Sequence, residues 1–135
     1  MKTTKLLGIS SVIAVMLLLA SCSAKEKVIK VLLDKTANEL NKTCPMMVDS
    51  ETRLDNASVL PGNIFQYNYT IVNYVKDSLD AGALQASIQP NMLNQIKTNP
   101  DLKLFRDNDV TLAYNYVDKN GVFILKLSFG PEDYK

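Results

Sequence analysis

Three acids lie close together in the segment 49–55 and could do chemistry together. Asp49, Glu51 and Asp55 could share acid–base work or hold a hard cation, which prefers carboxylate oxygens. The segment lacks the central glycine of a calcium-binding loop, and Arg53 lies among the acids. We therefore favour a turn capped by Asp49 and Ser50 that leads into a strand, with Arg53 paired to a neighbouring acid. We keep Asp49, Arg53 and Asp55 as candidate interaction residues.

A thiol and two thioethers follow one another at Cys44, Met46 and Met47. Such soft ligands suit Cu(I), but on a segment that enters a sheet they more often pack in a core. The sequence has no histidine, which removes the commonest general base and the commonest transition-metal ligand. We predict no metal site and no catalytic residue, and a non-enzymatic protein.

Tyrosines recur at alternate positions in two segments, as Tyr67 and Tyr69 and as Tyr114 and Tyr116. Tyrosine presents a large amphipathic surface at a low cost in side-chain entropy, so these four are the best candidates for a recognition surface. Both pairs share one face of a sheet if their strands are neighbours. The favoured alternative is that this face lies beneath the helices and belongs to the core.

The N-terminal segment has the pattern of an export signal. Lys2 and Lys5 precede residues 6–19, which carry no charge, and small residues follow. A basic start, a short apolar run and a small-residue exit are typical of a secretory signal peptide. The run is shorter than the roughly 20 apolar residues that span a bilayer.

Leu19-Ala20-Ser21-Cys22 resembles the lipobox of bacterial lipoproteins. This resemblance implies that a diacylglycerol is attached to the Cys22 thiol, that residues 1–21 are removed, and that the covalent lipid is the only bound group. Two acyl chains, usually joined by a third on the new amino terminus, anchor far more firmly than one. Ordinary cleavage after Ala20 or Ala24 is the alternative.

The residue after Cys22 bears on which membrane receives the protein. Enterobacterial lipoproteins retained at the inner membrane carry aspartate there, whereas this chain has Ser23. The acidic run that exports some Bacteroidetes lipoproteins to the cell surface is also missing. The resemblance therefore implies an anchor in the outer membrane, with the domain facing the periplasm.

Composition limits the partners of the remaining chain. Residues 1–21 contain two lysines and no acid, so their removal changes the formal net charge from +1 to −1. A nearly neutral domain gives no electrostatic reason to bind nucleic acid. With Cys22 acylated, Cys44 has no second thiol in the chain with which to form a disulfide.

Hydrophobic periodicity and turn residues set the expected elements. A helix is predicted over 28–42, ended before Pro45. Two strands, 52–60 and 63–74, are joined at Pro61-Gly62, and two more, 110–117 and 122–129, at Asn120-Gly121. Between them we expect a helix capped by Asp77 and Ser78 that stops near Ile88, and a second short helix from Pro90 to about Lys97.

These elements predict an α+β fold in the order helix, hairpin, helices, hairpin. Helices would cover one face of a four-stranded, mainly antiparallel sheet. We divide the chain into a removed signal peptide (1–21), a polar tether (22–27) and a single domain (28–135).

The segment 45–53, followed by a Tyr-x-Tyr strand, resembles small exported bacterial proteins of unassigned function. We expect an envelope lipoprotein that binds another protein or an envelope component, with the bilayer as its second partner. An inhibitor or immunity-type lipoprotein is a close variant. Less favoured are a small-ligand or metal carrier and an enzyme whose acids converge with Arg53 in a pocket.

Overall fold

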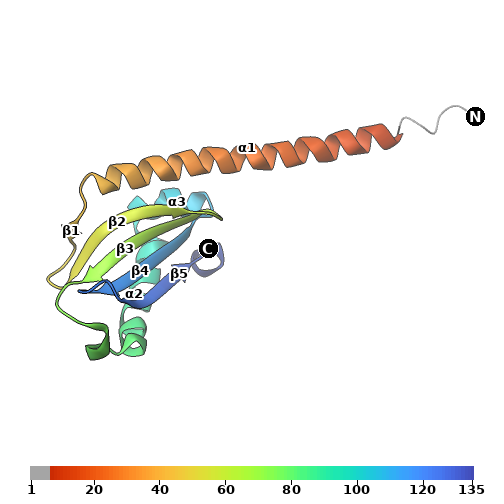
Figure 1. Cartoon of the computed structure of the whole chain (residues 1–135). Helices are drawn as coiled ribbons and strands as arrows, with labels where there is room; N and C mark the ends of the chain where they lie inside the picture. Colours follow the sequence, from red (N-terminus) through yellow and green to blue (C-terminus); the bar gives the residue numbers. More distant parts are fainter. Residues whose placement is uncertain (1–6) are drawn as a thin grey trace, which may run out of the picture.

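The computed structural model describes residues 7–135 of the chain, with side chains from residue 22 onward. Along the chain, one long helix precedes the strands of a sheet. Shorter helices lie between the third and fourth strands and after the last strand (Figure 1). The helices are α1 (Leu7–Asn41), α2 (Ala81–Thr98), α3 (Lys103–Asp107) and α4 (Pro131–Tyr134), with 3-10 turns at Lys76–Ser78 and Pro100–Leu102. The strands are β1 (Met46–Met47), β2 (Thr52–Leu60), β3 (Ile64–Ile71), β4 (Thr111–Asp118) and β5 (Phe123–Phe129).

The α+β class is confirmed, and three of the four strand pairings are antiparallel, in keeping with the predicted mainly antiparallel sheet; the predicted number of four strands is wrong. The sheet has five strands in the order β1-β2-β3-β4-β5, and β3 and β4 run parallel. The helical connection between them returns the chain to the end of the sheet where β3 began, which makes the two strands parallel. Both predicted hairpins, β2–β3 and β4–β5, are present.

Residues 22–27, which we expected to form a tether, continue α1 as helix. Lys2 and Lys5 lie outside the described residues, as do the side chains of residues 19–21. Among the residues described, no helix is both long enough and apolar enough to cross a membrane.

The predicted break at Pro90 is also wrong, because α2 runs through it as one helix. Proline removes one backbone hydrogen bond, yet Leu84, Ile88, Met92 and Ile96 recur at every fourth position and pack against the core. The burial of this continuous apolar stripe keeps the two halves of α2 in line. The helix begins later than expected, with Asp80 as its N-cap, where its carboxylate accepts from the Ala83 N–H at 3.0 Å.

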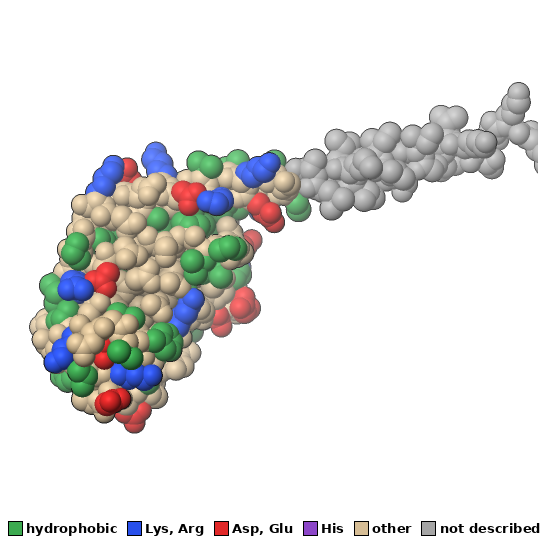
Figure 2. Space-filling view, viewed as in Figure 1, with side chains coloured by type: hydrophobic (Ala, Val, Ile, Leu, Met, Phe, Trp, Pro, Cys, Tyr) green, Lys and Arg blue, Asp and Glu red, His purple; other side chains and the backbone are tan. Residues whose placement is uncertain are grey.

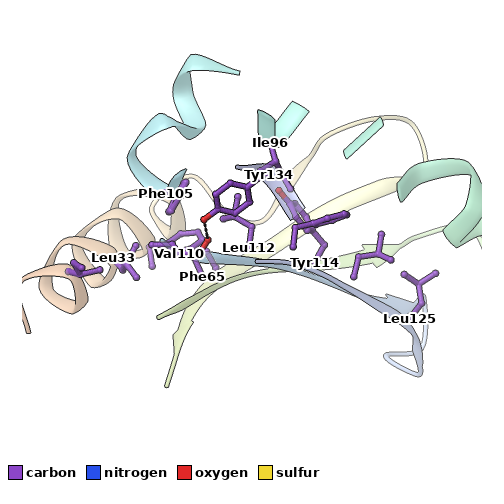
Figure 3. Packing of buried hydrophobic residues seen from close by; sticks show 14 of the residues in the cluster. Leu33, Phe65, Ile96, Phe105, Val110, Leu112, Tyr114, Leu125 and Tyr134 are labelled. Atoms are coloured by element: carbon purple, nitrogen blue, oxygen red, sulfur yellow. Dashed lines mark hydrogen bonds between the residues drawn. The ribbon is translucent and has the colours of Figure 1, made fainter. Parts of the chain in front are cut away.

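All four helices contribute to one core on the same face of the sheet. Leu33 from α1, Ile96 from α2 and Phe65 from β3 are fully buried, and Phe105 from α3 packs on Phe65 with ring centroids 4.8 Å apart. Figure 3 shows these side chains between the sheet and the helices. At the end of the chain the Tyr134 hydroxyl donates to the Val110 carbonyl at 2.8 Å, shown dashed.

Asp118 fixes the end of the sheet opposite the end from which α1 projects. It is 2 % exposed, and its carboxylate accepts from the N–H groups of Lys76, Asn120 and Val122 at 2.8, 2.8 and 2.9 Å. Burial raises the pKa of Asp118. The hydrogen bonds from these three backbone groups together lower that pKa by more than burial raises it, so the net shift is downward.

We expect Asp118→Asn to weaken the fold at neutral pH and to leave it unchanged at strongly acidic pH. A carboxylate with a lowered pKa in the folded state stabilises above its unfolded pKa of about 3.9, and this contribution is lost as the pH falls through the folded value. Thermal unfolding midpoints at pH 7, 4 and 2 measure the difference. Exposed Asp77→Asn is the control, and a gap between Asp118→Asn and wild type that is equal at all three pH values would contradict the assignment.

Candidate interaction site

Four tyrosines from the two central strands form a continuous strip on the helix-covered face. In the parallel register of β3 and β4, Tyr67 lies beside Tyr114 and Tyr69 beside Tyr116. The rings of the first pair are 5.2 Å apart and 15° from parallel, and those of the second pair are 5.1 Å apart and 17° from parallel. We call these four residues the tyrosine strip. Stacked rings at these separations stabilise one another.

The tyrosine strip lies between the places where the two longest helices dock. Helix α1 packs along β2, at one side of the sheet, and α2 packs on β5, at the other. Tyr114 is buried, whereas Tyr67, Tyr69 and Tyr116 are only half-buried. The strip is therefore neither an exposed sheet face, as a simple recognition surface would be, nor a closed core.

The phenol hydroxyls of the strip are incompletely used within the chain. The Tyr116 hydroxyl donates to the Met92 sulfur at 3.9 Å, while those of Tyr67, Tyr69 and Tyr114 have no hydrogen-bond partner among the described side chains. Within this part of the chain, Gln66 Oε1 is the only fully enclosed side-chain oxygen or nitrogen without a partner. The three unpaired hydroxyls therefore reach accessible surface.

Burial sets the protonation state of these hydroxyls. It raises the pKa of Tyr67 and of Tyr116 to about 12, and it raises the pKa values of Tyr69 and Tyr114 further. All four phenols are thus neutral at physiological pH and keep their protons. They offer hydrogen-bond donors beside an apolar ring surface, which suits an amphipathic partner.

Each acid of the segment 49–55 is engaged separately, and Asp49 lies close enough to Tyr116 for its charge to contribute to the raised pKa of that phenol. Asp49 accepts from the N–H groups of Glu51 and Thr52 at 2.8 and 2.7 Å, and these bonds, that of Glu51 foremost, lower the pKa of Asp49. Asp55 pairs with Arg53 at 2.6 Å and accepts from the Thr70 hydroxyl at 2.5 Å. In the part of the chain that the structure describes, no three His, Cys, Asp or Glu residues are grouped to hold a metal ion.

The structure brings the four tyrosines together, with Asp49 near Tyr116, but it does not gather all eight candidate residues into one site. The strip faces the helices, whereas the Arg53–Asp55 pair lies with Thr70 on the opposite, open face of the sheet. Cys22 is exposed on α1, far along the chain from either group.

Sequence reasoning missed the character of this open face. The open face carries an uncharged polar network. Gln66 donates to Asn68 at 2.8 Å, and Asn68 donates to Asn56 at 2.8 Å and to Ser58 at 3.3 Å. Figure 2 shows it as a mostly tan surface with few charged side chains. The alternation of Gln66 and Asn68 with the tyrosines was the available signal.

Cys44 and the methionines do not pack as expected. Cys44 is half-buried, and burial raises the pKa of its thiol. Met46 and Met47 are 40 % and 49 % exposed, so the prediction of core packing is wrong for both. The reason is that β1 is an edge strand of two residues, and no element within residues 7–135 pairs with its outer side.

The fold and the site define an α+β protein with an aromatic strip between two docked helices. The chain belongs to the family described as a domain of unknown function (DUF8479), whose model matches residues 27–124. Comparison with curated proteins gave no match.

Three solved structures share the fold at low sequence identity. A Pseudomonas aeruginosa protein described as secreted has a TM-score of 0.68 and 14% identity, covering 82% of this chain and 96% of its own. The pilotin EpsS of the Vibrio vulnificus type 2 secretion system has a TM-score of 0.66 and 11% identity, covering 84% and 97%. The type II secretion pilotin AspS of Vibrio cholerae has a TM-score of 0.61 and 14% identity, covering 84% and 98%.

Proposed function

We propose that this chain is a lipid-anchored envelope protein that binds another protein, as a pilotin-like module without catalytic activity. Cys22 carries the lipid, and the anchor lies in the outer membrane with the domain facing the periplasm. The lipobox resemblance supports the anchor. The fold shared with two type II secretion pilotins and a secreted protein supports an envelope role.

The observation that carries the binding role is the tyrosine strip. Three half-buried rings, one buried ring and three phenol hydroxyls without a partner among the described side chains form an amphipathic surface at the centre of the sheet. A protein segment that docks over the accessible parts of these rings would cover them and accept from the hydroxyls. Buried aromatic contacts of this kind dominate the energy of protein interfaces.

The direct test is affinity capture from envelope membranes with the lipidated protein, after cross-linking in intact cells. Cys22→Ala, which cannot be acylated, serves as the unanchored control. We expect a specific protein to be captured with the wild type and to be much reduced with Cys22→Ala. The reference is an unrelated domain fused to residues 1–22, so that it carries the same lipid anchor. The proposal fails if the wild type captures no protein more strongly than this reference does.

The role of the strip has its own prediction. Changing both Tyr67 and Tyr69 to phenylalanine should weaken partner binding about fivefold to tenfold, because two donors are lost and the rings remain. Folding stability should stay unchanged or rise slightly, since neither hydroxyl has a partner among residues 22–135. Binding is measured by titration with the captured partner, and stability by urea unfolding.

The matched control is Tyr134→Phe, which removes a hydroxyl that is bonded within the chain. It should lower the free energy of unfolding by about 1–2 kcal/mol and leave partner binding unchanged. Equal loss of binding in the control and in the double variant would show that the strip is not the contact surface.

A further inference from the structure

A cavity of about 600 Å³ lies beneath α1 at the end of the sheet from which the helix projects. Its wall is apolar where Leu33 faces Val59, Leu60 and Pro61, and Glu26 and Lys30 of α1 lie along its rim. Figure 2 shows the body hollowed below the helix in this region. The volume falls within the range of roughly 300–1,000 Å³ that is usual for pockets holding small ligands.

Cys22 lies on the face of α1 that overlooks this cavity. Residues four, eight and eleven positions after it are Glu26, Lys30 and Leu33, and such spacings keep side chains on one helical face. At 1.5 Å per residue, the Cys22 thiol is about 6 Å along the helix axis from the rim and about 16 Å from Leu33. An acyl chain on that thiol can therefore enter the cavity by running along α1 from Cys22 towards Leu33.

We propose that the cavity holds one acyl chain of the lipid on Cys22. This inference rests on the acylation of Cys22 in the proposed function. Two acyl chains suffice for stable membrane attachment, so a triacylated cysteine can place one chain in the cavity and still be anchored by the others. The acyl chain in the cavity would hold α1 at a fixed angle to the bilayer. It would thereby direct the opposite end of the sheet away from the membrane.

That opposite end carries exposed apolar side chains, which fits the inferred orientation. Val48 is 48 % exposed, and Val122 and Phe123, in and after the β4–β5 turn, are 47 % and 51 % exposed. They lie at the far end of the strands from the turn at Pro61 that borders the cavity. A domain held in this orientation presents them to the periplasm.

Photochemical cross-linking of the full chain tests the inference. Cells that express the protein are fed a fatty acid with a diazirine near its end and are then illuminated. The protein is purified, and its cross-linked residues are identified by mass spectrometry. We expect the acyl chain on Cys22 to cross-link to segments 26–33 and 59–63 of the same polypeptide. An acylated Cys22 with cross-links only to phospholipid or to residues 23–25 would overturn this inference and leave the anchor intact.

Two further outcomes separate the causes of a failure. A Cys22 that carries no lipid would overturn the anchoring part of the proposed function together with this inference. In Cys22→Ala, cross-links from membrane lipid to segment 59–63 at the wild-type yield would show that the cavity takes a bilayer lipid, which would overturn the assignment to Cys22.

Variants that fill the cavity complete the test. Leu60→Trp narrows it from the wall, and Glu26→Trp covers its rim without touching the core. Each should lower the cross-link yield severalfold, while Val31→Trp, at a position that is 68 % exposed on α1, should not. Wild-type yields in Glu26→Trp and in a Leu60→Trp protein with an unchanged circular dichroism spectrum would overturn the inference.

Discussion

Leu33→Ala is expected to lower the free energy of unfolding by about 2–5 kcal/mol. Leu33 is 1 % exposed and joins the core together with Ile29 and Ala37 from the same face of α1. Removing its side chain costs the transfer energy of the lost hydrocarbon groups and enlarges the cavity under α1, which Leu33 lines. Urea unfolding followed by tyrosine fluorescence measures the loss, since the chain has no tryptophan.

Val31→Ala is the matched control for Leu33→Ala, because Val31 lies on the same helix and is 68 % exposed. It should change the free energy of unfolding by no more than about 0.5 kcal/mol. A similar small change in Leu33→Ala would mean that α1 is not docked on β2 as described. The same result would also contradict the position of Leu33 in the wall of the cavity that is proposed to hold the acyl chain.

The hairpins were predictable because their signals are local. Pro61-Gly62 and Asn120-Gly121 supply residues that adopt positive φ, at 85° for Gly62 and 80° for Gly121, and alternating strands flank both turns. The pairing of one hairpin with the other depends on the whole connection between them. Nothing in the local pattern of 72–110 distinguishes a parallel return from an antiparallel one, so the parallel pairing of β3 with β4 could not be predicted.

Burial of the tyrosines could not be inferred from the strands alone. The alternation in 65–71 places Tyr67 and Tyr69 on one face, but the helices decide whether that face is covered. Here α1 and α2 dock at opposite sides of the sheet, which leaves the central tyrosines partly accessible. The length of α2, which follows from an apolar stripe that continues past Pro90, is part of this arrangement.

Asn41 was missed because its role depends on a partner distant in the sequence. Its side-chain amide donates to the Ala57 carbonyl at 2.9 Å and accepts from the Ala57 N–H at 2.7 Å. The amide thus pairs with the outer edge of β2 as a neighbouring strand would. Beyond β1 this edge has no further strand among the described residues, so Asn41 joins the end of α1 to the sheet and helps protect the edge from pairing with other chains.

We expect Asn41→Ala to lower the free energy of unfolding by about 2–4 kcal/mol. The change leaves the N–H and the carbonyl of Ala57 without partners, and Ala57 is 4 % exposed, so water replaces both bonds poorly. Alanine is the better helix former, which offsets roughly 0.5 kcal/mol of the loss. Urea unfolding gives the magnitude, and hydrogen exchange at the Ala57 amide shows whether the loss arises at that bond.

Asn38→Ala separates this tie from the change in helix propensity. Asn38 is exposed one turn earlier on α1, so its replacement should leave stability unchanged or raise it slightly. If Asn41→Ala matches Asn38→Ala and the Ala57 amide exchanges as in the wild type, the edge of β2 does not depend on Asn41. If the loss is as large as expected, the freed edge should also promote self-association, because an unpaired strand edge is a template for pairing with a second copy.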